Sequence, residues 1–370
     1  MIDFGINITN KNAKIAVAMS GGVDSSVVAA MLKTNGYNVV GLTMRLYNQA
    51  DQVNANKSCC AGKDINDAKT VASQFSIPHY TLDLQGKFFN GVIDNFTDTY
   101  IDGKTPIPCI RCNQTVKFTD MLNEAKKMKA DALVTGHYVR RVERSNQTRL
   151  YKAVDDLKDQ SYFLFATTKS QLEFLRFPLG NYTKDYVRKL ARDLNIKVKN
   201  KPDSQDICFI TGNSYSDFIS KIRPDAFAEG DILDINDKII GSHKGIINYT
   251  VGQRRKIGIG GRTEPLYVVS INPKNNTITV GKRSDLKKTK IFVNDLNWIS
   301  NSIKENTSYK VKIKSDQTPV SGKIQKIRKN ALEFIFEDAQ FSVAPGQACV
   351  FYKDDEVLGG GWIKKSEFID

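Results

Sequence analysis

Three cysteines have the spacing and neighbours that thiol chemistry needs. Cys109 and Cys112 form a Cys-x-x-Cys pair in the string TPIPCIRCN of residues 105–113, and Cys208 lies among polar residues in the string DSQDICFI of residues 203–210. An arginine and a helix N-terminus beside a thiol favour the thiolate, which is the nucleophilic form. The pattern fits a redox pair, a metal or iron–sulfur site, or a sulfur-transfer pair. A four-ligand zinc site is disfavoured, because the sequence lacks a second Cys-x-x-Cys pair or paired histidines.

A glycine-rich loop indicates a second kind of chemistry. Residues 18–26 read AMSGGVDSS, between the apolar runs 15–17 and 27–32. Adjacent glycines allow a sharp turn, so that amides and serine hydroxyls line a phosphate cradle at a helix N-terminus. The string lacks the Gly-Lys-Ser/Thr ending of a Walker A loop and the third glycine of a dinucleotide fingerprint. It resembles the pyrophosphate loop Ser-Gly-Gly-x-Asp-Ser, whose families cleave ATP between the α and β phosphates. The alternative is an ordinary strand-to-helix turn capped by Asp24 or Ser25.

The elements that must position these residues alternate between strand and helix patterns. Such alternation predicts a doubly wound parallel sheet, in which ligands bind beyond the carboxyl ends of the strands. Ser20 to Ser25, Met44 and Gly136-His137 all follow predicted strands, so we expect their three loops to share one nucleotide. The predicted strands are 15–17, 37–44, 79–84 and 131–136, and the predicted helices are 27–32, 64–75, 88–100, 116–128 and 183–195.

Several side chains receive specific expectations from this pattern. His137 follows a strand and is a candidate site residue, whereas we interpret His79 as structural and His243 as a surface residue. Asn113 or Thr115 is expected to cap the helix after the cysteine pair. In the helix 183–195 the spacing predicts that five residues face inward, namely Tyr186, Val187, Leu190, Ala191 and Leu194.

The second half of the chain has a different pattern of predicted secondary structure. Beyond Pro224 the sequence consists of short alternating strands broken by Gly and Asn. This pattern is typical of antiparallel β modules, and a small barrel is expected at the C-terminus. With 370 residues, the chain is long enough for two or three domains.

Composition restricts the partners and the compartment. The formal net charge of +14 favours nucleic acid as a partner, although a lysine-rich composition can also reflect codon bias. We find no apolar run long enough to cross a bilayer and no secretory signal, so we expect a cytoplasmic protein without a membrane partner. We interpret Cys59, Cys60 and Cys349 as small buried or solvent-facing residues.

Seven strings, in this order, are similar to the tRNA-specific 2-thiouridylase family. They run across nearly the whole chain, which makes the resemblance specific. Besides the pyrophosphate loop and the 105–113 string, they are TGHY at 135–138, KDQSYFL at 158–164, ICF at 207–209, GQRR at 252–255 and PGQ at 345–347.

The resemblance implies a fold and a reaction. It predicts an ATP-pyrophosphatase catalytic domain over 1–205, a central small β domain over 206–275 and a C-terminal, tRNA-binding β-barrel over 276–370. The implied reaction inserts sulfur at C2 of the wobble uridine in tRNAs for Lys, Glu and Gln, after ATP, with Mg²⁺, adenylates O2. Cys208 matches the persulfide carrier and Cys112 the nucleophilic cysteine, and the two would form a transient disulfide. An external persulfide donor, a cysteine desulfurase or a relay protein, is expected, because no rhodanese-like or ferredoxin-like extension is present.

The resemblance also implies two sets of binding residues. From charge alone we add Arg141, Arg144, Arg254 and Arg255 as basic candidates. The positions that match ATP contacts are Ala18, Met19, Ser20, Gly21, Gly22, Val23, Asp24, Ser25, Met44 and Gly136. The positions that match tRNA contacts are Ile107, Pro108, Cys109, His137, Lys158, Asp159, Gln160 and Gln347.

Two departures from the family pattern affect these assignments. Cys109 stands where other members often carry an Asp that is a candidate acid/base, so the role of this position is open. Residues 314–317 read KSDQ in place of a more basic Arg-Tyr-Arg-Gln string, so a tRNA contact there is weakened or moved.

Three other functions compete with thiolation by persulfide. A different pyrophosphate-loop enzyme, such as a tRNA lysidine synthetase or an amidating synthetase, needs no paired cysteines. A basic RNA-binding protein that senses nucleotide would show no turnover. An iron–sulfur-dependent thiolase would use Cys109, Cys112 and Cys208 as cluster ligands and leave one iron open.

The loop sequence generates the first prediction. We expect AMP and pyrophosphate as products, because the loop lacks the lysine that reaches the β and γ phosphates in a Walker A site. Asp24→Ala and Ser20→Ala are expected to depress turnover strongly. Chromatography of labelled ATP products measures this, and release of ADP with inorganic phosphate would contradict the nucleotide argument.

Overall fold

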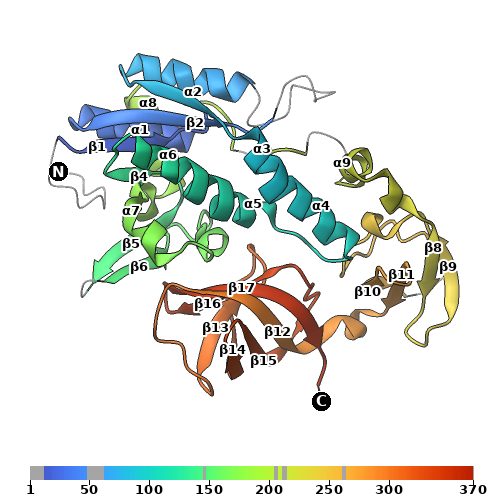
Figure 1. Ribbon diagram of the computed structural model, residues 1–370. Coiled ribbons are helices and arrows are strands. Elements are labelled where there is room, and N and C mark those ends of the chain that lie inside the picture. Colours follow the sequence, from blue (N-terminus) through green and yellow to red (C-terminus); the bar gives the residue numbers. More distant parts are fainter. Residues whose placement is uncertain are drawn as a thin grey trace. The chain divides into compact units, whose positions relative to one another are not determined.

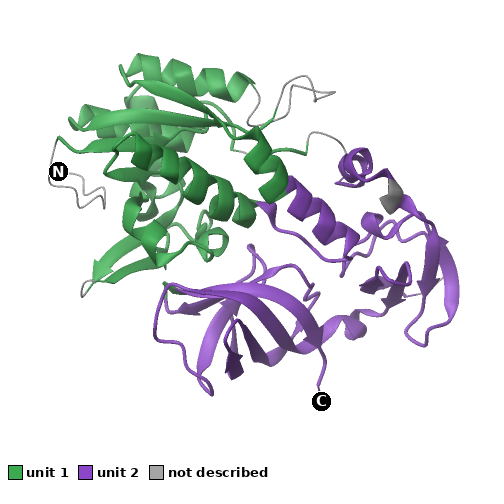
Figure 2. Ribbon diagram, in the orientation of Figure 1, with its two compact units in different colours: residues 1–92, 109–211, 355–357 green, residues 93–108, 212–354, 358–370 purple. Residues whose placement is uncertain are grey.

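The computed structural model describes residues 12–47, 62–144, 147–203, 207–210, 215–260 and 264–369. Cys59, Cys60 and the string 204–206 lie outside these residues. The chain divides into two compact units, coloured separately in Figure 2. Unit 1 comprises residues 1–92, 109–211 and 355–357, and unit 2 comprises residues 93–108, 212–354 and 358–370.

Unit 1 is built on a parallel sheet with the strand order β3-β2-β1-β4-β7 (Figure 1). Ile15, Ala16 and Val17 on the central strand β1 are all 0% exposed. Both faces of that strand are covered, which explains why its sequence is a continuous apolar run and not an alternating one. The strands are β1 (Lys14–Ala18), β2 (Asn38–Arg45), β3 (His79–Asp83), β4 (Ala132–Val134) and β7 (Leu175–Arg176).

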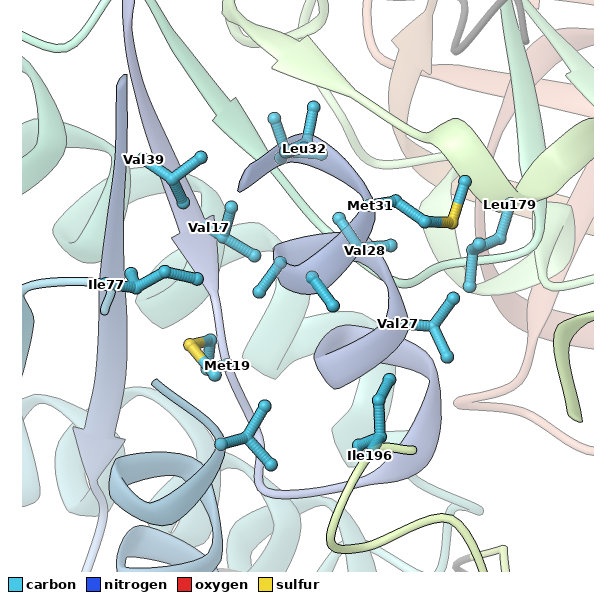
Figure 3. Close-up of a cluster of buried hydrophobic side chains, with 14 of the residues drawn as sticks. Val17, Met19, Val27, Val28, Met31, Leu32, Val39, Ile77, Leu179 and Ile196 are labelled. Atoms are coloured by element: carbon cyan, nitrogen blue, oxygen red, sulfur yellow. The ribbon is translucent and has the colours of Figure 1, made fainter. Parts of the chain in front are cut away.

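One face of this sheet packs against helices α1 (Val23–Thr34), α2 (Gly62–Gln74) and α8 (Lys184–Asp193). Figure 3 shows the contact: Val17 and Val39 from the strands meet Val28 and Leu32 from α1. Burying a side chain of this size contributes about 1.5–3 kcal/mol, so the cluster fixes α1 and the loop before it against β1. Other members of the same buried cluster are Met19, Val27, Met31, Ile77, Val187, Ala191 and Ile196.

The remaining elements of unit 1 are short. A hairpin of β5 (Val139–Arg144) and β6 (Gln147–Lys152) is antiparallel, and Thr168 begins α7 (Lys169–Phe174) with a capping box. The others are α3 (Gln85–Phe88), a second π-helix (Cys112–Met121), α6 (Leu122–Lys127), and 3₁₀ turns Ser161–Leu164 and Pro178–Asn181. Two further elements cross the boundary between the units: the first π-helix (Phe89–Ile93) ends with one residue of unit 2, and α5 (Pro108–Arg111) begins with one.

Unit 2 contains α4 (Asp94–Ile101), α9 (Tyr215–Ile222) and a small mixed sheet of order β10-β11-β8-β9. The sequence favoured antiparallel modules, but β11 runs parallel to β8, with Ile278 paired with Ile232. A long connection separates these two strands in the chain, which leaves room for the crossover that a parallel pair requires. The strands are β8 (Gly230–Leu233), β9 (Ile239–His243), β10 (Tyr267–Asn272) and β11 (Thr277–Gly281).

A closed antiparallel barrel completes unit 2. Its strand order is β12-β15-β14-β13-β16-β17, and β12 pairs again with β17. Phe334 and Phe351 are 0% exposed in its core, with ring centroids 5.5 Å apart. The strands are β12 (Lys287–Trp298), β13 (Ser308–Lys312), β14 (Val320–Arg328), β15 (Ala331–Phe341), β16 (Ala348–Lys353) and β17 (Glu356–Glu367). The predicted fold class, a doubly wound sheet followed by a small β domain and a β-barrel, is confirmed.

Three local expectations were wrong. Tyr186 is 38% exposed and stacks on Tyr182 at 5.2 Å, so it lies on the surface of α8. His243 is 2% exposed, because its Nε2 bonds to the carbonyl oxygen of Asn276 and its Nδ1 accepts from Gly245 N. Asn113 lies inside the helical segment, where its side-chain amide donates to Phe163 O at 3.3 Å. No helix among the described residues is long and apolar enough to cross a membrane.

A close backbone approach in unit 1 generates a stability prediction. A Cβ at buried Gly180 would lie 1.9 Å from Val139 O, whereas a Cβ at exposed Gly86 in α3 meets nothing within 4 Å. We expect Gly180→Ala to lower the free energy of unfolding by about 3 kcal/mol through overpacking. Gly86→Ala, the matched control, should raise it by about 0.5–1 kcal/mol. Urea unfolding of both variants tests this, and equal effects would contradict it.

Candidate functional site

The loop Ser20–Ser25 follows β1 and turns into α1. Ser25 Oγ accepts a hydrogen bond from Ser20 N at 3.1 Å and lies 3.2 Å from Ser20 Oγ. Gly22 is the N-cap residue of α1, and no side chain caps it. The alternative of an ordinary turn capped by Asp24 or Ser25 is therefore wrong, and both side chains have other partners.

Two glycines hold the loop tightly against its neighbours. Gly21 has φ +73°, and a Cβ there would lie 2.2 Å from Asp64 O at the start of α2. A Cβ at Gly136, just after β4, would lie 2.9 Å from Ser25 N. The loops after β1 and β4 therefore meet at backbone distance, where the strand order of the sheet reverses. That reversal is the usual ligand site of a doubly wound sheet.

The carboxylate of Asp24 is held by two groups. Lys184 Nζ lies 2.7 Å from Asp24 Oδ1 and 2.8 Å from Oδ2, and Tyr138 donates its hydroxyl to Asp24 Oδ1 at 2.8 Å. Burial, together with the charge of Asp24, raises the pKa of Tyr138, so its phenol stays a donor. Lys184 is itself buried, at 7% exposed.

The carboxylate of Asp203 forms ion pairs with three positively charged side chains. Lys158 Nζ and Lys184 Nζ each lie 2.9 Å from its carboxylate, and an Arg188 guanidinium nitrogen lies at 2.7 Å. Burial would raise the pKa of Asp203, but the hydrogen bonds from Lys158 and Lys184 outweigh it and lower the pKa to about 2. Because the folded pKa lies below the ordinary value of 3.8, this stabilisation is complete above pH 3.8 and is lost as the pH falls through about 2.

Lys201, which follows α8 in the chain, bonds to the same loop. Its Nζ donates to Gly21 O at 3.0 Å and lies 2.6 Å from the carboxylates of both Asp64 and Asp67. Burial would lower the pKa of Lys201, but the hydrogen bonds with Asp64 and Asp67 raise it, so the amine keeps its charge. Lys201 therefore connects the loop to α2 through a compensated ion-pair cluster.

The three site cysteines all belong to unit 1. Cys109 is exposed in α5, and Cys112 is half-buried at the first position of the second π-helix. Cys208 is half-buried, and its carbonyl oxygen accepts a hydrogen bond from Tyr47 Oη at 3.1 Å. Across residues 12–369, apart from the stretches the structure does not describe, no three His, Cys, Asp or Glu side chains are close enough to hold a metal ion. Cys109, Cys112 and Cys208 therefore do not form the group of three ligands that the iron–sulfur alternative requires.

His137 lies in an aromatic pocket beside the loop residues. Its ring meets Phe118 at 5.8 Å and Phe177 at 6.3 Å, and its Nδ1 lies 2.8 Å from Thr135 Oγ1. Burial, with the charge of Lys117, keeps the pKa of His137 well below its ordinary value. The ring is therefore neutral at physiological pH.

The KDQ string at 158–160 makes contacts inside unit 1. Asp159 Oδ1 accepts from Ala153 N at 3.1 Å, and Gln160 Oε1 accepts from Tyr138 N at 2.9 Å. Arg141 is buried and donates to Leu172 O at 2.8 Å, which leaves little of it for a surface contact. Their proposed role in tRNA contact stays a prediction.

Unit 2 brings two of the family strings together. Thr105 N donates to Pro345 O at 2.8 Å, and Gly346, with φ +87°, approaches Thr105 so closely that a Cβ would lie 2.9 Å from its oxygen. Ile107 and Gln347 are half-buried, and Pro108 is buried. In the altered 314–317 segment, Lys314 Nζ donates to Phe341 O at 3.4 Å.

The structure places the other predicted ATP residues on neighbouring elements. Five further residues surround the loop although each occupies an ordinary helix, linker or string position in the sequence: Lys184, Lys201, Asp203, Tyr138 and Asp64. The placement of the predicted set is Ala18 at the end of β1, Met19 to Gly22 in the loop, Val23 to Ser25 in the first turn of α1, Met44 in β2 and Gly136 after β4.

A parallel sheet with a Ser-Gly-Gly-x-Asp-Ser loop at its point of strand reversal defines a pyrophosphate-loop, ATP-binding protein. The loop lies at the N-terminus of α1, and glycine at 21 and 136 lets it pack against the backbone of Asp64 and Ser25, an arrangement that fits a phosphate-binding turn. Family models match residues 13–212, described as a tRNA methyl transferase HUP domain, residues 216–282, a tRNA methyl transferase PRC-barrel domain, and residues 288–363, an aminomethyltransferase beta-barrel domain.

Curated relatives match over nearly the whole chain. The tRNA-specific 2-thiouridylase MnmA of Orientia tsutsugamushi is 51% identical over 98% of this chain and 98% of its own length. That of Rickettsia massiliae is 51% identical over 97% of this chain and 99% of its own length. The chain therefore belongs to the tRNA-specific 2-thiouridylase family.

A solved structure, the U34-tRNA thiolase NcsA from Methanococcus maripaludis with its [4Fe-4S] cluster, is also similar. It is 18% identical, with 60% of this chain and 69% of that chain covered and a TM-score of 0.35. Similarity at this level is too low to transfer function.

The close approach at Gly21 generates a prediction with an internal control. Gly21 and Gly36 both have positive φ, at +73° and +86°, but a Cβ at Gly36 meets nothing within 4 Å. We expect Gly36→Ala to cost about 1 kcal/mol of stability from backbone strain alone. Gly21→Ala should cost about 1–3 kcal/mol more and should also weaken ATP binding, because the loop must move away from Asp64.

Thermal unfolding and calorimetric titration with ATP measure both effects. If the two variants bind ATP equally well, the close packing of the loop on α2 is not what shapes the phosphate cradle.

Proposed function

We propose that this protein catalyses ATP-dependent 2-thiolation of the wobble uridine in tRNAs for Lys, Glu and Gln. The observation that carries the proposal is the pyrophosphate loop in one compact unit with Cys112 and Cys208, in a chain about half identical to 2-thiouridylases. Such an enzyme is a tRNA sulfurtransferase. We also infer the three domains 1–205, 206–275 and 276–370 and a cytoplasmic location, where tRNA is found.

The loop residues prepare the first step. O2 of the uridine attacks the α-phosphorus of ATP, and pyrophosphate leaves. In this proposal the backbone amides at the start of α1 and the hydroxyls of Ser20 and Ser25 receive the phosphates, while Lys184 and Lys201 hold the loop in place through their bonds to Asp24 and to Gly21 O. Mg²⁺ accompanies ATP and neutralises phosphate charge.

The cysteines carry the second step. The terminal sulfur of a Cys208 persulfide attacks C2 of the activated uridine. The Cys112 thiolate then attacks the Cys208 sulfur, so that the persulfide bond breaks, a Cys112–Cys208 disulfide forms and the new sulfur stays on C2 as AMP leaves. An external persulfide donor reloads Cys208 after a thiol reductant has opened the disulfide.

The first experiment tests the activity itself. Purified protein, ATP, Mg²⁺, unmodified tRNA, a thiol reductant and a persulfide donor (a cysteine desulfurase with cysteine) are incubated, and the tRNA nucleosides are analysed by mass spectrometry. We expect 2-thiouridine that depends on both ATP and the enzyme. Pyrophosphate release without any thiolated nucleoside would favour another pyrophosphate-loop enzyme.

The cysteine assignment generates a separate prediction. Serine neither carries sulfur nor ionises at neutral pH, so Cys112→Ser and Cys208→Ser should abolish thiolation. Cys109 is the exposed thiol that replaces an acid of the family pattern, so Cys109→Ser should keep partial activity and Cys109→Asp at least as much. The measurement is 2-thiouridine per enzyme, with a persulfide donor supplied and iron quantified.

The same variants test the alternatives. Loss of activity in all three serine variants, together with bound iron, would favour a cluster mechanism. An active Cys112→Ser beside an inactive Cys109→Ser would reverse the assignment within the Cys-x-x-Cys pair.

A further inference from the structure

One outer side of the C-terminal barrel gathers basic residues. It lies on the neighbouring strands β17, β12, β15 and β14, which are labelled in Figure 1. Val293, Leu332 and Ile363 on three of these strands are buried in the core of the barrel, and Ile327 on β14 packs against the same core. Because side chains alternate along a strand, the residues on either side of these four point outward. We call the following outward residues the basic face: Phe292, Lys326, Arg328, Glu333, Lys364 and Lys365.

The pairing of the strands brings four of these side chains into one row. Phe292 on β12 pairs with Lys365 on β17 and, on its other side, with Glu333 on β15. Glu333 pairs in turn with Lys326 on β14. Side chains that pair directly on one face of a sheet have Cβ atoms about 4.5–5.5 Å apart. The row therefore has a cation at each end, with an aromatic ring and a carboxylate between them.

The basic face is hollowed. Its cavity has a volume of about 380 Å³, which falls within the range of about 300–1,000 Å³ that is usual for ligand sites. Four cations line this cavity, namely Lys326, Arg328, Lys364 and Lys365, and Glu333 is the one acid that lines it. The shape and the lining thus favour a negatively charged ligand.

The nearby carboxylates compensate only part of this charge. Glu333 lies 2.7 Å from Lys290 Nζ and 3.6 Å from an Arg328 nitrogen, and Glu367 lies 2.5 Å from Lys365 Nζ. The side chains of Arg328 and Lys365 are 65% and 66% exposed, so these two pairs are weak and can exchange for another anion. Five cations face two carboxylates, which leaves a net charge of +3: Lys290, Lys326, Arg328, Lys364 and Lys365 against Glu333 and Glu367.

Phe292 gives the basic face an aromatic centre. Its half-buried ring lines the cavity, and Lys290 Nζ lies 5.0 Å from the ring centroid. Surfaces that bind nucleic acid combine cations, which contact the phosphates, with aromatic rings, on which a base or sugar packs. The combination on this barrel therefore fits a nucleic-acid strand better than an isolated small anion.

We propose that the basic face binds the sugar–phosphate backbone of tRNA, with Lys326, Arg328 and Lys364 as phosphate contacts. The inference rests on the proposed function for its choice of tRNA, and it adds a binding surface outside the seven family strings. The surface is also separate from the altered 314–317 segment. That segment precedes β14, whereas Lys326 and Arg328 lie near the other end of the same strand.

The test removes the three proposed phosphate contacts from the full chain. Lys326→Gln, Arg328→Gln and Lys364→Gln are combined, and binding of fluorescently labelled, unmodified tRNA is followed by anisotropy over a series of KCl concentrations. Each lost contact should reduce the slope of log K against log salt by about 0.7–0.9, so the triple variant should lose about 2 or more. At about 100 mM KCl we expect its Kd for tRNA to rise at least about tenfold.

A matched variant controls for total charge. Lys304→Gln, Lys310→Gln and Lys353→Gln remove three exposed lysines that lie before β13, on β13 and at the end of β16. This control loses the same charge from the same barrel, and its Kd should stay within about twofold of the unaltered protein, since salt screens distant charges. Thermal melting shows whether each variant is folded. If the basic-face triple melts at a much lower temperature, Lys364→Gln alone should still reduce the salt slope by about 0.7–0.9.

The outcomes separate this proposal from the proposed function. An unchanged salt slope in the folded basic-face variant overturns the surface. An equal loss in the control triple also overturns it, because binding would then follow total charge and not position. Formation of 2-thiouridine is assayed separately on the unaltered protein. If the basic face contributes to tRNA binding but no 2-thiouridine forms, the proposed function fails and the binding surface stands.

Discussion

The close packing of backbone on backbone around the loop 20–25 is the constraint on which the rest of unit 1 depends. Gly21 meets the carbonyl of Asp64 and Gly136 meets the amide of Ser25, at distances that exclude even a methyl group. The loop therefore cannot widen without moving α2 or the end of β4. Its amides are held in place before any ligand arrives, which lowers the cost of ordering them when phosphate binds.

Ion pairs also hold the loop in place. Lys184 and Lys201 reach the loop from the last part of unit 1, and both are paired with carboxylates that compensate their burial. A buried cation without such partners would lose its proton or destabilise the fold. Because Lys184 pairs with Asp24 and Asp203, and Lys201 with Asp64 and Asp67, these positive charges are compensated beside the loop. Lys184 at 7% and Lys312 at 8% exposed are the buried lysines among the described residues.

Sequence periodicity predicted much of the fold, but it predicted only part of the candidate site. The apolar run at 15–17 and the glycines after it located β1 and the loop, because both features are local. Lys184 and Asp203 gave no such indication, since a lysine at the start of a polar helix and an aspartate in a linker are usually solvated. Tyr186 matched the spacing of the buried face but lies on Tyr182 at the surface, and His243 was buried by hydrogen bonds that no periodicity reports.

The closed ladder of the C-terminal barrel has a consequence for how the protein can evolve. Each of the strands β12 to β17 has at least two hydrogen-bonded neighbours, so the backbone of the barrel is satisfied whatever side chains point outward. Outer charges can then drift by mutation at little cost to folding. The KSDQ segment at 314–317, which departs from the more basic family string, lies in the loop between β13 and β14, so this departure leaves the hydrogen-bonded ladder of the barrel intact.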